Sequence, residues 1–236
     1  MNNYWIDFWK DYSADISNKG EQTQVLRTFN KKPIDKATWE FTLKTIQAPL
    51  NLVASDDVLE LCCGNGLISQ YISSKVKSVM SVDVSKELID ELRSKNIGNI
   101  HAVSSDIRTL EVEDNKFDKI IIYAGIQYLD HSETIVLIKN IFSWLKPNGI
   151  VLLGDIPDSA KLWEFYNSDE RESVFFDHCE NNTDVVGTWF EKAFFEKLSK
   201  YAKFASCRVL EQNDKLIYSS FRYDFVAHKG DFHAET

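Results

Sequence analysis

The stretch VLELCCGNGLIS, residues 58–69, decides the fold because it joins a buried strand to a glycine-rich turn. Its apolar first half predicts a strand, and Gly64 and Gly66 predict a turn in which the backbone can approach a ligand closely. The helix expected after the turn would direct its first N–H groups toward that ligand. Cys62 stands where the first glycine of such a loop usually lies. The stretch therefore predicts a cofactor-binding loop, and its neighbours must decide which cofactor.

Strand-length apolar runs alternate with helical patterns from residue 57 to residue 157. The runs at 57–61, 78–82, 99–103, 117–123 and 150–153 predict strands, and the patterns at 66–74, 85–95 and 135–145 predict helices. This alternation indicates βαβ units and a parallel sheet that is covered by helices on both faces.

The C-terminal part predicts a different end to the sheet. The sequence Thr188–Glu191 matches a capping box and predicts a helix that ends near residue 203. Two β-rich runs follow, at 205–212 and 217–227, and the short connection between them predicts a hairpin at 213–215. The sheet is therefore expected to end in an antiparallel pair.

Two segments flank or interrupt this expected domain of residues 57–228. Residues 1–56 are mostly helical in pattern and predict an N-terminal helical cap. Residues 158–187 form a long connection rich in aromatic side chains, and long connections in compact domains often serve as lids. We expect a substrate lid here; the alternative is that these aromatic residues only pack the segment onto the sheet. Residues 229–236 are expected to form a polar tail.

Composition limits the class of protein and its partners. The 236 residues are 44% hydrophobic and 27% charged, which is typical of a soluble globular protein. The net charge of −9 disfavours nucleic acid as a partner. The N-terminus lacks the pattern of a signal peptide, and no apolar run is long enough to span a bilayer. Four cysteines show no disulfide or zinc spacing: Cys62, Cys63, Cys179 and Cys207. We expect a cytoplasmic protein with no metal and no membrane partner.

Two acidic residues near the loop indicate the kind of cofactor. Glu60 lies in the strand just before the turn. A carboxylate there would not help to bind a pyrophosphate, but it would attract an ammonium group of a ligand. Asp83 ends the next strand, where a carboxylate can accept hydrogen bonds from both hydroxyls of a ribose. A NAD site would share Asp83 but would normally show GxGxxG, and Cys62 and Ser69 replace the first and third glycines. This pattern disfavours NAD.

These motifs resemble those of class I S-adenosylmethionine-dependent methyltransferases over roughly residues 57–227. Glu60–Gly66 matches the family's acidic residue and glycine-rich turn, and Asp83 stands where the family has its ribose-binding acid. Ser105–Ile107 falls at the adenine contact, 117–124 resembles the fourth-strand motif, and 145–149 resembles the turn before the fifth strand. The resemblance implies an α/β, Rossmann-like, seven-stranded and mostly parallel sheet with an antiparallel C-terminal strand, helices on both faces and an N-terminal helical cap.

The resemblance also implies a set of site residues for S-adenosyl-L-methionine. Those expected around the cofactor are Glu60, Gly64, Gly66, Asp83, Val84, Asp106 and Ile107, with Tyr123 and Gln127 near the methionine part and the transferred methyl group. Cys62 is expected to serve as a small residue that still permits the turn. Arg27 could grip the methionine carboxylate or a substrate phosphate, or could be a surface arginine on a helix.

Substrate residues should follow the carboxyl ends of the strands. The candidates are Tyr128, His131 and Asp155. His131 has the right chemistry for a general base, since an unperturbed imidazole has a pKa of about 6.5, but it could merely precede a helix cap. Asp155 could act similarly or could hold the strand end together.

The implied reaction is transfer of a methyl group to an oxygen or nitrogen nucleophile of a small molecule, such as a sugar- or nucleotide-linked compound or a secondary-metabolite precursor. The run Tyr123–Tyr128 lacks the Asn-Pro-Pro-Tyr pattern of amino-adenine methyltransferases, which disfavours that substrate. Two alternatives stay open from the sequence: a non-catalytic module that binds S-adenosylmethionine, and a NAD-type Rossmann oxidoreductase.

Overall fold

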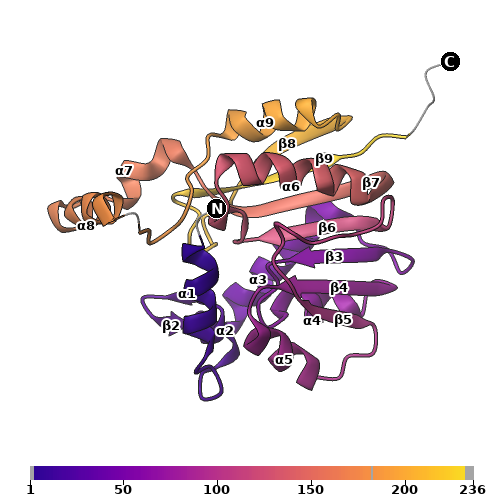
Figure 1. Ribbon diagram of the computed structural model, residues 1–236, viewed down its shortest axis with the longest axis horizontal. Coiled ribbons are helices and arrows are strands. Elements are labelled where there is room, and N and C mark those ends of the chain that lie inside the picture. Colours follow the sequence, from indigo (N-terminus) through magenta and orange to yellow (C-terminus); the bar gives the residue numbers. More distant parts are fainter. Residues whose placement is uncertain (1–2, 182, 232–236) are drawn as a thin grey trace.

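The structure is a computed structural model that describes residues 3–181 and 183–231. Its centre is a seven-stranded sheet of order β5-β4-β3-β6-β7-β9-β8 (Figure 1). The strands are β3 (Asp57–Leu61), β4 (Ser78–Asp83), β5 (Ile100–Ser104), β6 (Phe117–Tyr123), β7 (Leu145–Pro157), β8 (Ser206–Glu211) and β9 (Arg222–His228). Strands β3 to β7 are parallel, and β9 is antiparallel to both β7 and β8. The expected Rossmann-like sheet is confirmed.

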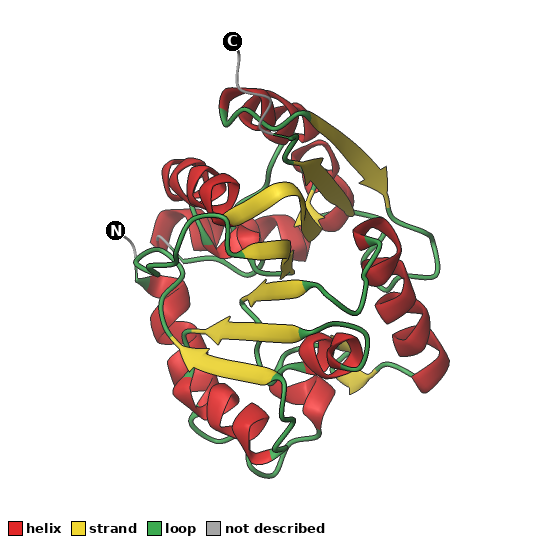
Figure 2. Cartoon of the chain, turned by 90° about the vertical axis from the view of Figure 1, so that its right-hand side faces the viewer, coloured by secondary structure: helices red, strands yellow, loops and turns green. Residues whose placement is uncertain are grey.

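Helices cover both faces of the sheet (Figure 2) because successive residues of a buried strand point to opposite faces. Leu59 and Leu61 of β3 share one cluster with residues of α6 (His131–Trp144) and α9 (Lys192–Tyr201). Val58 precedes Leu59 and points to the opposite face, where it shares the other cluster with residues of α3 (Lys36–Gln47) and α4 (Leu67–Ser73). The helix α5 (Lys86–Ser94) packs through Ile89 and Leu92 beside β5. Helix α6 begins at His131, earlier than residue 135, because Asp130 and Glu133 form a capping box.

The N-terminal segment divides between the core and the rim of the sheet. It contains α1 (Tyr4–Ser13), α2 (Glu21–Gln24) and a two-stranded sheet of β1 (Thr28–Phe29) and β2 (Lys32–Pro33), followed by α3 and a 3₁₀ turn at Ala48–Leu50. Leu43, Ile46 and Leu50 are buried in the same cluster as the strands. α3 therefore belongs to the layer that covers the sheet, and the part before it is only partly helical. A division at residue 56 remains a prediction, since α3 shares the core of the sheet.

The predicted antiparallel C-terminal pair is confirmed, since β8 and β9 lie side by side, but the predicted short connection at 213–215 is wrong. β8 ends at Glu211 and β9 begins at Arg222, and the connection between them is formed by turns. Tyr218 in this connection donates a hydrogen bond of 2.6 Å to the Thr28 carbonyl oxygen, so the connection packs on the N-terminal segment instead of pairing. Thr188 is likewise not a helix cap. Its hydroxyl donates to the Leu129 carbonyl oxygen at 2.7 Å, and α9 begins only at Lys192.

The segment 158–187 carries two helices, α7 (Leu162–Phe165) and α8 (Asp169–Asn181), that project away from the sheet (Figure 1). At the other end of the chain, the expected tail begins with a buried residue. The Lys229 ammonium donates to the Phe142 and Leu145 carbonyl oxygens at 2.7 and 2.6 Å, near the C-terminal end of α6 where carbonyls lack helical partners. Residues 232–236 lie outside the described residues. The described helices include none with the length and apolar character needed to cross a membrane.

Candidate active site

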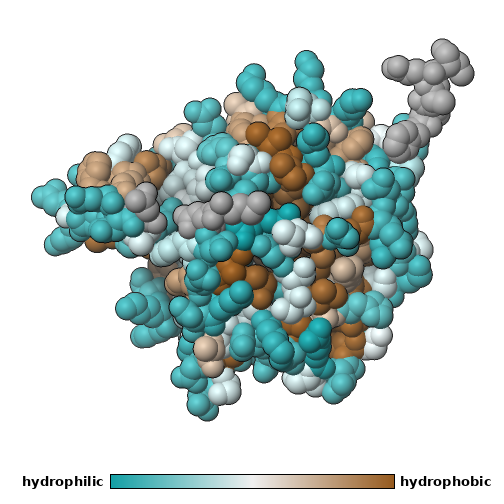
Figure 3. All heavy atoms as spheres, viewed as in Figure 1, coloured by the Kyte–Doolittle hydropathy of each residue, from teal (hydrophilic) through white to brown (hydrophobic). Residues whose placement is uncertain are grey.

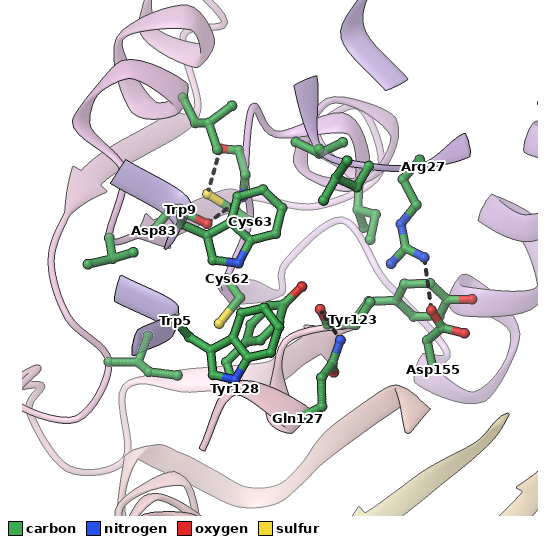
Figure 4. A pocket seen from close by; sticks show the side chains of 18 of the residues that line it. Trp5, Trp9, Arg27, Cys62, Cys63, Asp83, Tyr123, Gln127, Tyr128 and Asp155 are labelled. Carbon is green, nitrogen blue, oxygen red and sulfur yellow. Dashed lines mark hydrogen bonds and ion pairs between the residues drawn. The ribbon is translucent and has the colours of Figure 1, made fainter. Parts of the chain in front are cut away.

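A cavity of about 320 Å³ opens where the carboxyl ends of four parallel strands meet. Glu60 of β3 lines it. So do Asp83 of β4, Tyr123 of β6 and Asp155 of β7 (Figure 4). This is the edge at which open α/β sheets bind their ligands. Helix α1 supplies a further wall. Among the described residues, no group of three His, Cys, Asp or Glu side chains is arranged to hold a metal ion.

The loop after β3 holds a cysteine in a glycine conformation. Cys62 has φ of 56°, in the left-handed region, and Gly64 and Gly66 follow with φ of 56° and 75°. Space for the cysteine side chain comes from Gly125, since a Cβ there would lie 2.5 Å from the Cys62 Cβ and 2.8 Å from its sulfur. Cys62 and Gly64 line the cavity. Gly66 is not among its lining residues and packs toward Leu92 as the N-cap of α4.

Asp83 connects the loop to the next strand. Its two carboxylate oxygens accept from the backbone N–H groups of Gly64 at 2.8 Å and Ser85 at 2.9 Å. Burial raises the pKa of Asp83, and these backbone hydrogen bonds oppose the rise. Each oxygen has a further lone pair, so the carboxylate can still accept hydrogen bonds from a ligand in the cavity. Val84 lines the cavity beside it.

Glu60 is a buried acid without a positively charged partner among the described residues. Its carboxyl accepts a hydrogen bond from the Ser69 hydroxyl, which also lies 2.6 Å from the Ser81 hydroxyl oxygen. Burial raises the pKa of Glu60 to about 8, although the hydrogen bond from Ser69 lowers it in part. A cationic ligand group beside Glu60 would stabilise the carboxylate form.

Asp106 and Ile107 line the cavity beyond β5. The Asp106 carboxylate accepts two hydrogen bonds from the Arg108 guanidinium, at 2.9 Å from Nε and 2.7 Å from Nη2. Burial raises the pKa of Asp106, but its hydrogen bonds and ion pair with Arg108 outweigh that effect and hold the pKa below its usual value. Arg108 also pairs with Glu133 at 3.2 Å, which fixes this corner of the cavity.

An aromatic group lies over the middle of the cavity. The Tyr128 ring lies 4.7 Å from the Trp5 ring and 5.8 Å from the Trp9 ring, and both tryptophans come from α1 (Figure 4). Burial raises the pKa of Tyr128 to about 12, so the hydroxyl keeps its proton at neutral pH. Gln127 is buried, and its Nε2 donates to the Ala124 carbonyl oxygen at 3.0 Å. Its Oε1 has no hydrogen-bond partner within the described chain, which leaves an acceptor at the cavity.

Arg27 lies at the far end of the cavity with its side chain only 13% exposed, so the alternative of a surface arginine is wrong. Its Nη1 donates to the Asp155 carboxylate at 2.9 Å, and the guanidinium lies 4.7 Å from the centre of the Tyr123 ring (Figure 4). Burial raises the pKa of Asp155, but the charges of Arg222 and Arg27 outweigh that effect and lower it. Asp155 is therefore an ionised and paired carboxylate at neutral pH.

His131 lies apart from the other candidates. It is the first residue of α6, and its ring packs 4.9 Å from the rings of both Phe190 and Phe194. It is exposed and is not among the residues that line the cavity. The sequence left open that His131 merely precedes a helix cap; the structure instead makes Asp130 the N-cap, and His131 follows it as the first residue of α6. This position does not support a general base at the cavity.

Several cavity residues could not be found from motifs in the sequence. They include Trp5, Trp9, Asn65, Phe165, Tyr218 and Arg222. Asn65 lies within the glycine-rich turn, and its Nδ2 donates to the Glu21 carbonyl oxygen at 2.9 Å and to Gln24 Oε1 at 2.7 Å. Its position in the turn was the only available signal. The others come from segments distant in sequence whose approach only the fold reveals.

Comparisons with known proteins agree with this geometry. Residues 58–149 match the family model of a methyltransferase domain. The ubiquinone biosynthesis O-methyltransferase of Rickettsia typhi is 26% identical over 63% of this chain and 58% of its own length. The demethylmenaquinone methyltransferase of Staphylococcus haemolyticus is 24% identical over 58% of this chain and 56% of its own. The chain thus spans about half the length of the curated relatives it matches.

Solved structures share the fold. The structure described as a DhpI-SAM-HEP complex superimposes with a TM-score of 0.65 at 15% identity, covering 95% of this chain and 96% of that one. An S-adenosylmethionine-dependent methyltransferase from Clostridium acetobutylicum gives 0.61 at 19% identity, covering 84% and 93%. The fold and the cavity together define a Rossmann-like, cofactor-dependent enzyme domain. Residues 58–149 carry a methyltransferase domain, and the surrounding fold is that of the class I methyltransferases, whose cofactor is S-adenosylmethionine.

Proposed function

We propose that this protein transfers a methyl group from S-adenosylmethionine to an oxygen or nitrogen nucleophile of a small molecule in this cavity. One observation carries the proposal: a single cavity joins the acidic and glycine-rich end at Glu60, Gly64 and Asp83 to a second end at Arg27 and Asp155. Such a cavity can hold two reactants side by side, which is the main requirement of an in-line displacement. A cytoplasmic location and acceptors such as sugar- or nucleotide-linked compounds belong to the same proposal.

The residues at the first end fit the chemical groups of the cofactor. Glu60 offers a carboxyl for the ammonium group, and Asp83 offers acceptor positions for the ribose hydroxyls. Val84 and Ile107 line the cavity with apolar surface suited to the adenine ring. Asp106 would accept hydrogen bonds at the adenine edge, although it is already paired with Arg108. When bound, the cofactor supplies an electrophilic methyl group on a sulfonium centre.

The residues in the middle and at the second end would position the acceptor. Tyr123 and Gln127 would lie near the reacting methyl group, where an aromatic face stabilises a sulfonium by about 1 kcal/mol. Tyr128 keeps its proton and can donate a hydrogen bond, while Trp5 and Trp9 exclude water above it. Asp155 is a weak base because it is paired with Arg27. We assign Tyr128 and Asp155 positioning roles and propose no general base at His131.

Calorimetry with S-adenosylhomocysteine tests the cofactor assignment. The wild-type protein is expected to bind it and not to bind NAD. Asp83→Asn should weaken binding at least tenfold because one ribose acceptor is replaced by a donor, about 1.4 kcal/mol or more. Asp90→Asn is the matched control, since the Asp90 side chain is 45% exposed on α5 and its ion pairs within the described chain are with Lys86 and Arg93 of the same helix. Equal affinity of the Asp83 variant and the wild type would show that the cofactor assignment is wrong.

A methyl-transfer screen then separates an enzyme from a non-catalytic binding module. The protein is incubated with methyl-labelled S-adenosylmethionine and a set of small oxygen and nitrogen acceptors. Label in an acceptor, lost in Asp83→Asn, is the expected result. Tight binding of S-adenosylhomocysteine together with no transfer to any acceptor would favour the binding module instead.

A further inference from the structure

We propose that the acceptor carries an oxyanion, a carboxylate or a phosphate-type group, which Arg222 binds at the second end of the cavity with Arg27 beside it. This inference rests on the proposed function, because it names the chemical class of acceptor for the same cavity. Its evidence is the unequal number of cationic and anionic groups that face the cavity at this end.

Two largely buried guanidinium groups share one carboxylate. Arg27 Nη1 lies 2.9 Å from Asp155 Oδ2, and Arg222 Nη1 lies 3.8 Å from the same oxygen. The side chains of Arg27, Arg222 and Asp155 are only 13%, 9% and 4% exposed. Desolvated charges are costly unless they are paired, and Arg222 lies 3.8 Å from a carboxylate oxygen to which Arg27 already donates, so its own charge lacks a close partner. An oxyanion in the cavity would balance it.

Arg222 also keeps an unused donor. Its Nη1 donates to the Asp155 carbonyl oxygen at 2.6 Å, but its Nε is buried and has no hydrogen-bond partner in the described part of the chain. The guanidinium lies 5.5 Å from the centre of the Tyr218 ring and 5.3 Å from that of Phe221, which hold the planar group in place. A fixed guanidinium with free donors is the group that proteins use to bind carboxylates and phosphates through two parallel hydrogen bonds.

The neighbouring acid Asp224 lies behind Asp155, where its charge acts on Arg27 without a direct ion pair in the described chain. Its Oδ1 accepts from the Asp155 N–H at 2.7 Å and from Gln212 Nε2 at 2.8 Å. No ion pair joins Asp224 to a described basic residue, and Asp224 is not among the cavity-lining residues. Burial raises the pKa of Asp224 to about 6. Asp224 is therefore mostly ionised at neutral pH and partly offsets the charge of Arg27, but it lies behind Asp155, so two guanidinium groups and one carboxylate line the cavity itself.

The position of Arg222 favours the acceptor over the cofactor. Glu60 lies on β3, and β6 and β7 separate β3 from β9, on which Arg222 lies. With neighbouring strands about 4.8 Å apart, the two strands are about 14 Å apart. The cofactor's carboxylate is attached to the same carbon atom as the ammonium group that we assign to Glu60. It therefore belongs near the first end, and Arg222 is left for a different anion.

Matched probes test this inference on the full chain saturated with S-adenosylhomocysteine. The probes are benzoate against benzamide and phenyl phosphate against phenol, titrated by calorimetry. At least one charged probe is expected to bind tenfold or more tightly than its neutral partner. Arg222→Met should reduce that preference below threefold, with affinity for S-adenosylhomocysteine within twofold of wild type. Arg208→Met, on the exposed side of the neighbouring strand β8, should keep the preference.

The outcomes separate the two proposals. If neither charged probe is preferred, or if Arg222→Met keeps the preference, the oxyanion site is excluded even when S-adenosylhomocysteine binds. If S-adenosylhomocysteine does not bind, the proposed function fails, and the same probe pairs are then measured on the free protein. Arg222→Lys is a second variant, which keeps the inference testable if Arg222→Met does not fold. It keeps the charge but loses the planar donors, so it should weaken the charged probe at least threefold and leave the neutral probe unchanged.

Discussion

At the scale of single residues, Cys62 shows how one departure from a glycine pattern is compensated. A left-handed conformation costs a residue with a side chain about 1–2 kcal/mol relative to glycine. Cys62 adopts it with φ of 56°, and its side chain occupies the space that Gly125 leaves open. The sequence showed a small residue at this position but could not show that a glycine more than sixty positions away makes room for it. The two residues therefore act as a pair.

A double-mutant cycle tests this pair. Gly125→Ala should lower the free energy of unfolding by about 1–3 kcal/mol, because the new methyl group would overlap the Cys62 side chain. In the Cys62→Gly background, the same change should cost less than about 1 kcal/mol, since the overlapping atoms are gone. Urea unfolding of the four proteins gives the coupling energy. Gly98→Ala, where a Cβ would meet nothing within 4 Å, serves as control. Additive effects would contradict the pairing.

Glu60 predicts that cofactor binding releases a proton. In the free protein, burial raises the pKa of Glu60 to about 8, so the carboxyl is mostly protonated at pH 6.5. An ammonium group beside it favours the carboxylate, and binding should then release close to one proton. Affinity for S-adenosylhomocysteine should accordingly rise with pH between 6 and 7.5, by at most about tenfold per unit. Calorimetry at pH 6.5 in buffers of different ionisation enthalpy measures the proton directly.

Glu60→Gln is the control for this proton. It should abolish the release, and a variant that still releases one proton would exclude Glu60 as its source. The raised pKa of Glu60 also makes the free energy of unfolding of the cofactor-free protein depend on pH. Because the folded pKa lies above the ordinary value of 4.5, the contribution of Glu60 is fully present below pH 4.5 and is lost as the pH rises through 8. The wild type should therefore lose stability relative to Glu60→Gln over that range.

At the scale of elements, the sequence predicted the strands and helices whose residue pattern follows from their own burial. The central strands were clear because runs such as the three isoleucines at 120–122 are fully buried and serve the clusters on both faces of the sheet. The C-terminal details failed because local patterns were satisfied by distant partners. Thr188 bonds to Leu129 instead of capping α9, and Tyr218 bonds to Thr28 instead of joining a strand. A β-rich run without a pairing partner becomes a turn, and no local signal distinguishes the two cases.

At the scale of the whole molecule, the sequence predicted the floor of the cavity but not its walls. The acidic residues at the strand ends follow from the order of strands and turns, since a parallel sheet brings those ends together. The walls depend on contacts between remote segments, such as Arg27 with Asp155 and the Tyr4 hydroxyl with the Asp184 carbonyl oxygen. Arg222 could not be predicted either, because none of the residues next to it in the sequence indicates that the start of β9 lines a cavity.

The projecting segment gives the final prediction, which concerns the molecule as a whole. Trp163, Val174 and Phe176 are exposed on it, and Figure 3 shows apolar side chains among polar ones in this lobe. α8 buries none of its residues, whereas Phe165 and Val186 at the base of the segment line the cavity. The helix therefore contributes little to the fold in this conformation. We propose that it acts as a lid on the acceptor, since lids that close over a cavity exclude water from bound reactants.

Replacing Asp169–Asn181 with a flexible glycine-serine segment of equal length tests the lid. The free energy of unfolding should change by less than about 1 kcal/mol, because the helix buries no residue. Affinity for S-adenosylhomocysteine should stay within twofold, since Glu60 and Asp83 lie at the other end of the cavity. Affinity of the cofactor-bound protein for the preferred charged probe should fall at least fivefold. Unchanged probe affinity would show that the segment is not a lid and that its aromatic residues serve packing alone, whereas a large loss of stability would place α8 in the core of the fold.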